Sequence, residues 1–231
     1  MVAQAEDGLT LQDLAQRLQI TPSAAHNLAR TLLAKRFLVK GNRPIRYRLG
    51  PASCELADTH RGRQLLQHAE TALRQLVGHF PDATVTLTET IGGEVMTILR
   101  ISPDRPNIVQ RPTGLVMPPY TSANSLVFQA FWSEEERFAY QQRYPFSEYG
   151  THIWHTSEQF EQFLNTVRQY QYAALPVDAS GLLRVAVPLF SATHALTASI
   201  GVSMHVSPNR RHSVTEKIIA AAREAARSIN T

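Results

Sequence analysis

Residues 20–33 read ITPSAAHNLARTLL, and this stretch predicts a helix with two different faces. Thr21 and Pro22 are residue types that favour the N-cap and the first helical position. From there, an apolar stripe recurs at helical spacing: Ala25, Leu28, Ala29 and Leu32. A polar set recurs on the opposite face: Ser23, His26, Asn27 and Arg30. This pattern is typical of an ordinary amphipathic surface helix, and it also suits a helix that lies in the major groove of DNA.

The segments around this helix favour the second interpretation. Residues 9–18 (LTLQDLAQRL) predict a short helix with Thr10 as its cap, and its apolar stripe is Leu11, Leu14, Ala15 and Leu18. Only Gln19 and Ile20 separate the two helices. Residues 35–40 and 45–49 predict two short strands joined by a turn. Two helices followed by a hairpin make a winged helix-turn-helix.

The positive charge is concentrated in the same part of the chain. Residues 1–50 hold eight Lys or Arg and three acids, a net charge of +5, whereas the whole chain carries +4. Residues 51–231 are therefore close to neutral. Basic residues of the wing and the second helix would contact DNA phosphates, and we expect Arg43, Arg46 and Arg48 to do so.

The length and composition are typical of a globular protein with two domains. Its 231 residues suffice for one small and one medium domain, and a hydrophobic content of 43% supports a real core. The sequence contains no long apolar run and no signal-peptide pattern, so we expect a cytoplasmic protein without a membrane partner. Cys54 is the only cysteine, which excludes an intrachain disulfide and a thiolate metal cluster. We expect neither a metal nor a cofactor.

Three regions divide the chain. Residues 1–50 form the predicted winged helix-turn-helix. Residues 2–6 resemble the last turn of the helix that usually precedes the pair, so we expect either that the true start codon lies upstream or that this version has a reduced first domain. Residues 51–62 contain a predicted linker helix over 52–58, and residues 63–231 form the second domain, which begins with a long helix over 63–79. In that domain we expect strands over 84–90, 94–101, 107–111, 183–190 and 196–205, with helices over 122–132, 157–170 and 213–229. Residues 133–136 (SEEE) form a predicted capping box with Ser133 as the cap, which opens a further helix. Hairpins and long helices on an antiparallel sheet make an α+β domain.

Several stretches resemble the IclR family of bacterial transcriptional regulators. The first is LTLQDLAQRLQITPSAAHNLARTLLAKRFLV, followed by YRLGP, and the later ones are PPYTSANSLVFQAF, RVAVPLF and IGVSMHVSPNR. The resemblance implies a winged helix joined by a linker helix to a GAF/PAS-like effector-binding domain. It also implies homodimers or homotetramers that bind a palindromic operator in double-stranded DNA, as repressors or activators, under the control of a small organic acid.

The sequence departs from the usual family pattern at informative positions. Asn27 stands where the family usually has Arg or Lys, and Arg36 stands where it usually has Gly. In the second domain, Arg184 replaces a common Cys, and Gly201 replaces one Ser of a pair of which Ser203 is kept. The operator sequence and the pocket chemistry are therefore this chain's own.

The resemblance also implies an effector cavity. It places five positions around that cavity: Tyr120, Ala123, Asn124, Arg184 and Ser203. A guanidinium in an otherwise apolar cavity favours a carboxylate, which would bind to Arg184 through two parallel hydrogen bonds. Alternation with Val185 and Val187 leaves a second interpretation open, in which Arg184 points outward to solvent.

Enzymatic interpretations find little support. His152 and His155 have a helical metal-ligand spacing, but we expect a loop there and no third ligand follows. Ser203 and His205 share a strand face without an acid to orient the histidine. We therefore expect a non-enzymatic, ligand-responsive DNA-binding regulator. The alternatives are a small-molecule-binding GAF-like protein with an impaired DNA-binding domain and, with less support, a hydrolase.

Overall fold

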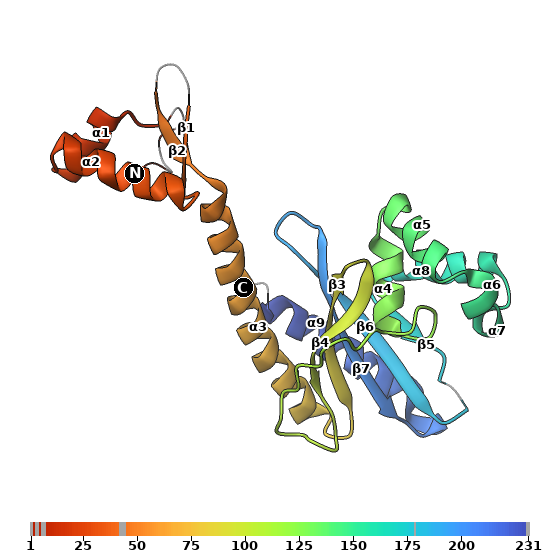
Figure 1. Cartoon of the computed structure of the whole chain (residues 1–231). Helices are drawn as coiled ribbons and strands as arrows, with labels where there is room; N and C mark the ends of the chain where they lie inside the picture. The colour runs from red at the N-terminus through yellow and green to blue at the C-terminus, as the bar shows by residue number, and fades with distance from the viewer. Residues whose placement is uncertain (1, 3–4, 6–7, 42–44, 178, 230–231) are drawn as a thin grey trace. The chain divides into compact units, whose positions relative to one another are not determined.

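The computed structural model describes residues 2, 5, 8–41, 45–177 and 179–229, with the side chains of residues 54–64 left out. The chain divides into two compact units, Met1–Gln64 and Leu65–Thr231 (Figure 1). The first unit contains the helices α1 (Leu11–Leu18) and α2 (Pro22–Ala34) and a hairpin of β1 (Leu38–Lys40) and β2 (Tyr47–Leu49). This is the predicted helix-turn-helix with its wing.

Both helices of the N-terminal unit begin at the predicted caps. The backbone N–H of Asp13 donates to the Thr10 hydroxyl, and the Thr10 N–H donates to the Asp13 carboxylate, which forms a capping box. The Thr21 hydroxyl accepts from the Ala24 N–H, and Pro22 follows it at the first helical position. Gln19 ends α1 in the left-handed conformation, which turns the chain sharply into α2.

The core of this unit is smaller than the sequence pattern indicates. Its buried hydrophobic residues are Leu9, Leu14, Ala15, Ala25, Ala29, Leu38 and Tyr47. Two residues of the predicted apolar stripes stay outside it, because Leu18 is 39% exposed and Leu28 is 43% exposed. Periodicity identified the correct side of each helix but overstated the width of the buried strip, since so small a unit covers only part of each helix.

A single helix, α3 (Pro51–His79), replaces the two helices predicted over residues 52–58 and 63–79. The boundary between the two compact units falls inside it, after Gln64. Between residues 58 and 63 the weakest helix former is Gly62. A glycine inside a helix lowers helix stability by about 1 kcal/mol relative to Ala, and this penalty is too small to end the helix. The prediction of two helices was therefore wrong.

The second unit is built on a five-stranded antiparallel sheet. Its strands are β3 (Thr84–Ile91), β4 (Glu94–Ile101), β5 (Ala173–Leu175), β6 (Leu182–Phe190) and β7 (Leu196–His205), in the spatial order β4-β3-β7-β6-β5. The two predicted hairpins, β3–β4 and β6–β7, meet where β3 pairs with β7. The two strands that pair there therefore come from opposite ends of the domain.

Helices cover both faces of this sheet (Figure 1). The C-terminal half of α3 and α9 (Arg211–Ile229) bury one face through an aliphatic core that includes Leu73, Leu76, Ile218 and Ala222. The other face meets α4 (Ala123–Phe131) and α8 (Ser157–Tyr170) through a second core. Between those helices lie α5 (Glu134–Arg143), which starts at the predicted capping box of Ser133, and the short helices α6 (Phe146–Tyr149) and α7 (Thr151–Trp154).

Two predicted elements differ from the structure. Residues 107–111 are not a strand, since Pro106 and Pro112 flank the segment and only Gln110 exchanges backbone hydrogen bonds with Arg100. Helix α9 begins before Ser213, because a 3₁₀ turn, η2 (Pro208–Arg210), leads directly into it. Ser207 and Pro208 provide the same type of start signal as Thr21 and Pro22.

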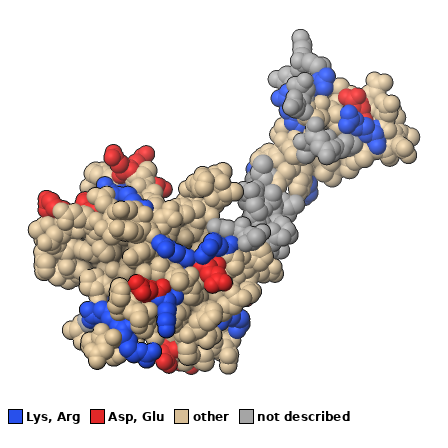
Figure 2. Space-filling view, turned by 180° about the vertical axis from the view of Figure 1, so that it is seen from behind, with Lys and Arg blue, Asp and Glu red and all other residues tan. Residues whose placement is uncertain are grey.

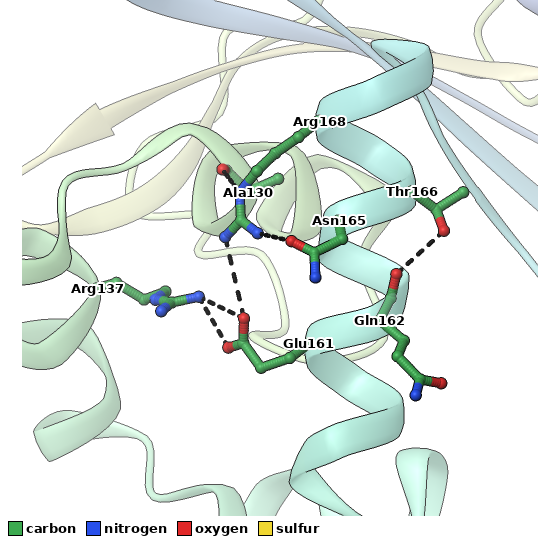
Figure 3. Close-up of polar contacts among 7 residues, drawn as sticks. All are labelled: Ala130, Arg137, Glu161, Gln162, Asn165, Thr166 and Arg168. Carbon is green, nitrogen blue, oxygen red and sulfur yellow. Dashed lines mark hydrogen bonds and ion pairs between the residues drawn. The ribbon is translucent and has the colours of Figure 1, made fainter.

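A polar network joins α4, α5 and α8 (Figure 3). Both carboxylate oxygens of Glu161 lie 2.8 Å from a guanidinium nitrogen of Arg137, and Arg168 donates from Nε to the Ala130 carbonyl at 2.6 Å. Arg168 also donates to Asn165. Because Ala130 is near the end of α4, this network fixes the helix whose first turn lines the site described below.

We predict that Gly50→Ala destabilises the N-terminal unit by about 1–3 kcal/mol, because a Cβ there has no room. It would lie 2.2 Å from the Arg36 carbonyl oxygen. The matched control is Gly41→Ala, whose Cβ would lie 3.6 Å from the nearest atom. Hydrogen exchange over residues 8–41 measures the effect, and equal protection in the two variants would contradict it.

Candidate functional site

The polar face of α2 is presented to solvent. Ser23, His26, Asn27 and Arg30 are all exposed, whereas Ala25 and Ala29 on the opposite face are buried. Thr31 donates its hydroxyl to the Asn27 carbonyl, so that side chain is occupied within the helix. The exposed groups are short donors and acceptors with one guanidinium, the types of group that read base edges.

Two of the three arginines expected to contact phosphates, Arg46 and Arg48, lie in the described part of the wing. Arg48 is exposed on β2, beside Val39 in the paired strand β1. Arg46 is half-buried and donates from Nη1 to the Gly8 carbonyl at 3.0 Å, so it also holds the chain that enters α1. Arg43 lies outside the described residues. In Figure 2, basic side chains are visible on the N-terminal unit next to the grey region.

The second unit contains a cavity of about 360 Å³ between the sheet and the start of α4. Four of the five predicted effector residues line it: Ala123, Asn124, Arg184 and Ser203. Arg184 is half-buried and is among the residues that line the cavity. Apolar side chains complete the wall: Leu115, Met117, Pro118, Leu182, Val185 and Val202.

Tyr120 does not line this cavity. It is buried in an aromatic cluster with Phe146 and Phe160, and its hydroxyl donates to the Tyr144 carbonyl at 2.9 Å. Burial raises the pKa of Tyr120 to about 12. Its backbone carbonyl accepts from the Trp154 indole at 3.1 Å. Tyr120 therefore anchors the loop that precedes α4, and its placement in the cavity was wrong.

Asn124 reaches the sheet because Gly201 has no side chain. A Cβ on Gly201 would lie 2.5 Å from both amide atoms of Asn124 and 2.8 Å from the Thr86 hydroxyl. In the space thus left open, the Asn124 amide donates to Thr86 Oγ1 at 3.0 Å and accepts from Ser199 Oγ at 3.1 Å. The absence of a side chain at Gly201 thus lets the first turn of α4 bond to both β3 and β7.

Sequence reasoning missed the residues that β3 and β4 contribute, which are Thr84, Thr86, Thr97 and Arg100. Simple alternation places Thr97 and Arg100 on opposite faces of β4. The β3–β4 register shifts by one residue, because Leu87 pairs with Leu99 while Thr88 pairs with Thr97. This bulge at Ile98 turns both side chains to the cavity, and no local pattern in the sequence reveals it.

Arg100 provides a second cationic group in the cavity wall. Its side chain is half-buried and forms no hydrogen bond or ion pair with any described residue. The exposed Asp104 has a pKa below its usual value, because of a hydrogen bond from Ser102 and, to a smaller extent, the charge of Arg100. No Asp or Glu is among the described residues that line the cavity, so its wall favours an anion.

The rim of the cavity is tied to α4 and β4. The Thr97 N–H donates to the Leu115 carbonyl at 2.9 Å, and the Met117 N–H donates to the Val95 carbonyl at 2.8 Å. From α4, the Gln129 amide donates to the Pro119 carbonyl at 2.7 Å. Residues 115–121 are thereby held as a fixed wall beside the cavity.

The residues considered for catalysis or metal binding lie on and beside α7 and on β7. His152 lies on α7 and His155 at its end, so this segment is a helical turn rather than the predicted loop. Within the described residues, no group of three potential metal ligands occurs. His205 contacts the Ser180 carbonyl at 3.1 Å through Nδ1.

Comparison with known families identifies both units. Residues 1–41 match the IclR helix-turn-helix domain, and residues 58–231 match the C-terminal domain of bacterial IclR transcriptional regulators. The chain belongs to the IclR family. It is therefore a DNA-binding transcriptional regulator with an effector-binding domain, and not an enzyme.

Solved structures of IclR regulators share the fold across the chain. The Thermotoga maritima IclR is 18% identical, with a TM-score of 0.57, and the match covers 99% of this chain and 92% of that one. A putative transcriptional regulator from Rhodococcus sp. RHA1 is 20% identical, with a TM-score of 0.60, and the match covers 96% of this chain and 88% of that one. An IclR homologue from Microbacterium hydrocarbonoxydans complexed with 4-hydroxybenzoate is 20% identical, with a TM-score of 0.58, and the match covers 99% of this chain and 93% of that one.

No curated protein matches the sequence. None of the described helices is long and apolar enough to cross a membrane.

We predict that Gly201→Ala destabilises the effector domain by about 1–3 kcal/mol, because the new Cβ collides with the Asn124 amide. Adding Asn124→Ala removes that collision, so the double variant should lose less stability than the sum of the two single variants. Denaturant unfolding of all three variants tests this. Gly78→Ala, whose Cβ would meet nothing within 4 Å, is the control, and strict additivity would contradict the prediction.

Proposed function

We propose that this IclR regulator binds a palindromic operator through α2 and the wing, and that a small organic anion in the effector cavity changes its affinity for DNA. Its target is chromosomal DNA, so it acts in the cytoplasm. The observation that carries the DNA-binding part is the exposed polar face of α2. Ser23, His26, Asn27 and Arg30 lie on that face, opposite a buried stripe of alanines.

The two parts of the N-terminal unit have different roles in this proposal. Ser23, His26 and Asn27 read base edges, because short polar side chains on a helix reach the floor of the major groove. Arg43, Arg46 and Arg48 contact phosphates and set the register of the protein on the duplex. Arg46 retains guanidinium donors for this purpose, since one of its five N–H groups is used by the Gly8 carbonyl.

Symmetry accounts for the palindrome. A single helix-turn-helix contacts only a few base pairs, and two copies related by a two-fold axis read two inverted half-sites. We infer that the regulator acts as a homodimer or as a homotetramer made of two dimers. Equilibrium sedimentation of the free protein and of its operator complex distinguishes these states.

The chemistry of the cavity supports an organic anion as the effector. Arg184 offers a guanidinium for a carboxylate, and Asn124 and Ser203 offer an amide and a hydroxyl beside apolar walls. The Asn124 amide is already held by Thr86 and Ser199, so it is preorganised rather than mobile. The relative complexed with 4-hydroxybenzoate shows that an IclR homologue binds a small aromatic acid.

We predict that substitutions on α2 and on the wing have different effects on DNA binding. Asn27→Ala or Ser23→Ala should relax sequence preference, by about 1–3 kcal/mol for each base edge that the side chain no longer reads. Arg48→Ala should weaken binding to all duplexes alike and reduce the slope of log K against log salt by about 0.9. Selection from a random duplex pool, followed by fluorescence anisotropy, measures both quantities.

The control for this series is Lys217→Ala, an exposed substitution on α9 in the other unit. If Arg48→Ala changed the selected sequence while the two α2 variants retained it, the assignment of the reading helix would be wrong. DNA binding that does not depend on salt would contradict the role of the wing.

We predict that Arg184→Ala weakens effector binding about ten- to a hundredfold, because it removes a charge-assisted pair from a sheltered cavity. DNA affinity without effector should change little, since the two sites couple only when ligand is bound. Thermal-shift screening of organic acids identifies a ligand, and calorimetry compares the wild type with the variant. Arg105→Ala, an exposed residue outside the cavity wall, is the control. Unchanged effector affinity in Arg184→Ala would remove this residue from the site.

A further inference from the structure

Two arginines enter the effector cavity from strands that flank its floor on either side. Arg100 belongs to β4 and Arg184 to β6, and the strand order β4-β3-β7-β6 places two strands between them. Three strand spacings separate the backbones of β4 and β6 by about 14 Å. The two arginines therefore start from opposite sides of the cavity floor.

The floor between the two arginines is made of small residues. Thr86 pairs with Arg100 on one side and with Gly201 on the other, while Ser203 pairs with both Thr84 and Arg184. These positions offer hydroxyl groups and open backbone but little bulk. An elongated molecule can lie across β3 and β7, with one end near each guanidinium.

We propose that the effector carries two anionic groups, one at each end, bound by Arg184 and Arg100. This inference rests on the proposed function, since it names the chemical class of the molecule that the cavity senses. The favoured ligand is a small dicarboxylate whose short middle lies over the small residues of β3 and β7. A phosphorylated hydroxy acid has the same two-ended charge and is distinguished in the experiment below.

A ligand with one carboxylate leaves half of this arrangement unused. The half-buried Arg100 has no hydrogen-bonding partner for its side chain among the described residues, and an apolar ligand end would strip water from it without replacing the lost hydrogen bonds. A second carboxylate replaces that water with charge-assisted hydrogen bonds. The cavity therefore discriminates between a dianion and a monoanion of the same length.

Matched pairs of acids test the proposal on the full-length protein by calorimetry. The pairs are succinate and butyrate, glutarate and pentanoate, adipate and hexanoate, and phosphoglycolate and glycolate. We expect at least one dianion to bind about ten- to a hundredfold more tightly than its partner, which has only one anionic end. Preference within the first three pairs identifies a dicarboxylate, and preference only within the last identifies a phosphorylated acid.

Arg100 variants connect that preference to the second guanidinium. Arg100→Gln should remove the advantage of the dianion while leaving the affinity of the monoanion within about twofold, and Arg100→Lys should retain part of it. Arg105→Gln, on the exposed loop outside the cavity wall, should behave as the wild type. Thermal unfolding of each variant verifies that the domain is folded.

The outcomes separate this inference from the proposed function. If a monoanion binds as tightly as its dianion, and Arg184→Ala weakens both while Arg100→Gln weakens neither, the two-ended ligand is wrong and an organic-acid sensor remains. If no acid of the panel binds and none alters DNA affinity, both the inference and the organic-anion part of the proposed function are overturned.

Discussion

The effector domain depends on one close approach, that of the Asn124 amide to the backbone at Gly201. Because no Cβ intervenes, the amide bonds to Thr86 on β3 and Ser199 on β7, and so the first turn of α4 is fixed to both of these paired strands. The same absence of side-chain bulk leaves the floor of the cavity open between Arg100 and Arg184. Gly201 therefore contributes both to the attachment of α4 and to the space that a ligand can fill.

Asn124 also connects the ligand-facing surface to the rest of the domain. It lies in the cavity wall at the start of α4, while the end of α4 is held by Arg168 through the Ala130 carbonyl and, through Glu161, by Arg137 on α5 (Figure 3). A ligand that competes for the Asn124 amide acts on a helix restrained at its far end. The opposite face of the sheet is filled by aliphatic side chains of α3 and α9, which give the floor a rigid support.

Local signals in the sequence were sufficient for most elements but not for the shape of the site. The caps at Thr21 and Ser133 and the two long hairpins could be predicted, because capping and alternation depend on neighbouring residues. The place of Arg100 in the cavity wall could not be predicted, since the direction of its side chain depends on a register shift between β3 and β4. Tyr120 was misplaced because resemblance identifies its position in the chain, whereas its side chain is directed by aromatic partners on α6 and α8.

The pairing of β3 with β7 has a consequence for how the domain folds. The Thr88 hydroxyl donates to the Ser199 carbonyl across 111 residues, and the β3–β7 ladder joins segments that are similarly distant in the chain. Closing such a loop is slow and comes late, because much chain entropy is lost before the contacts compensate for it. During synthesis, the β3–β4 hairpin therefore leaves the ribosome with its threonine face uncovered. The ligand cavity comes into existence only when β7, almost the last element of the chain, adds its glycine and its serine beside that hairpin.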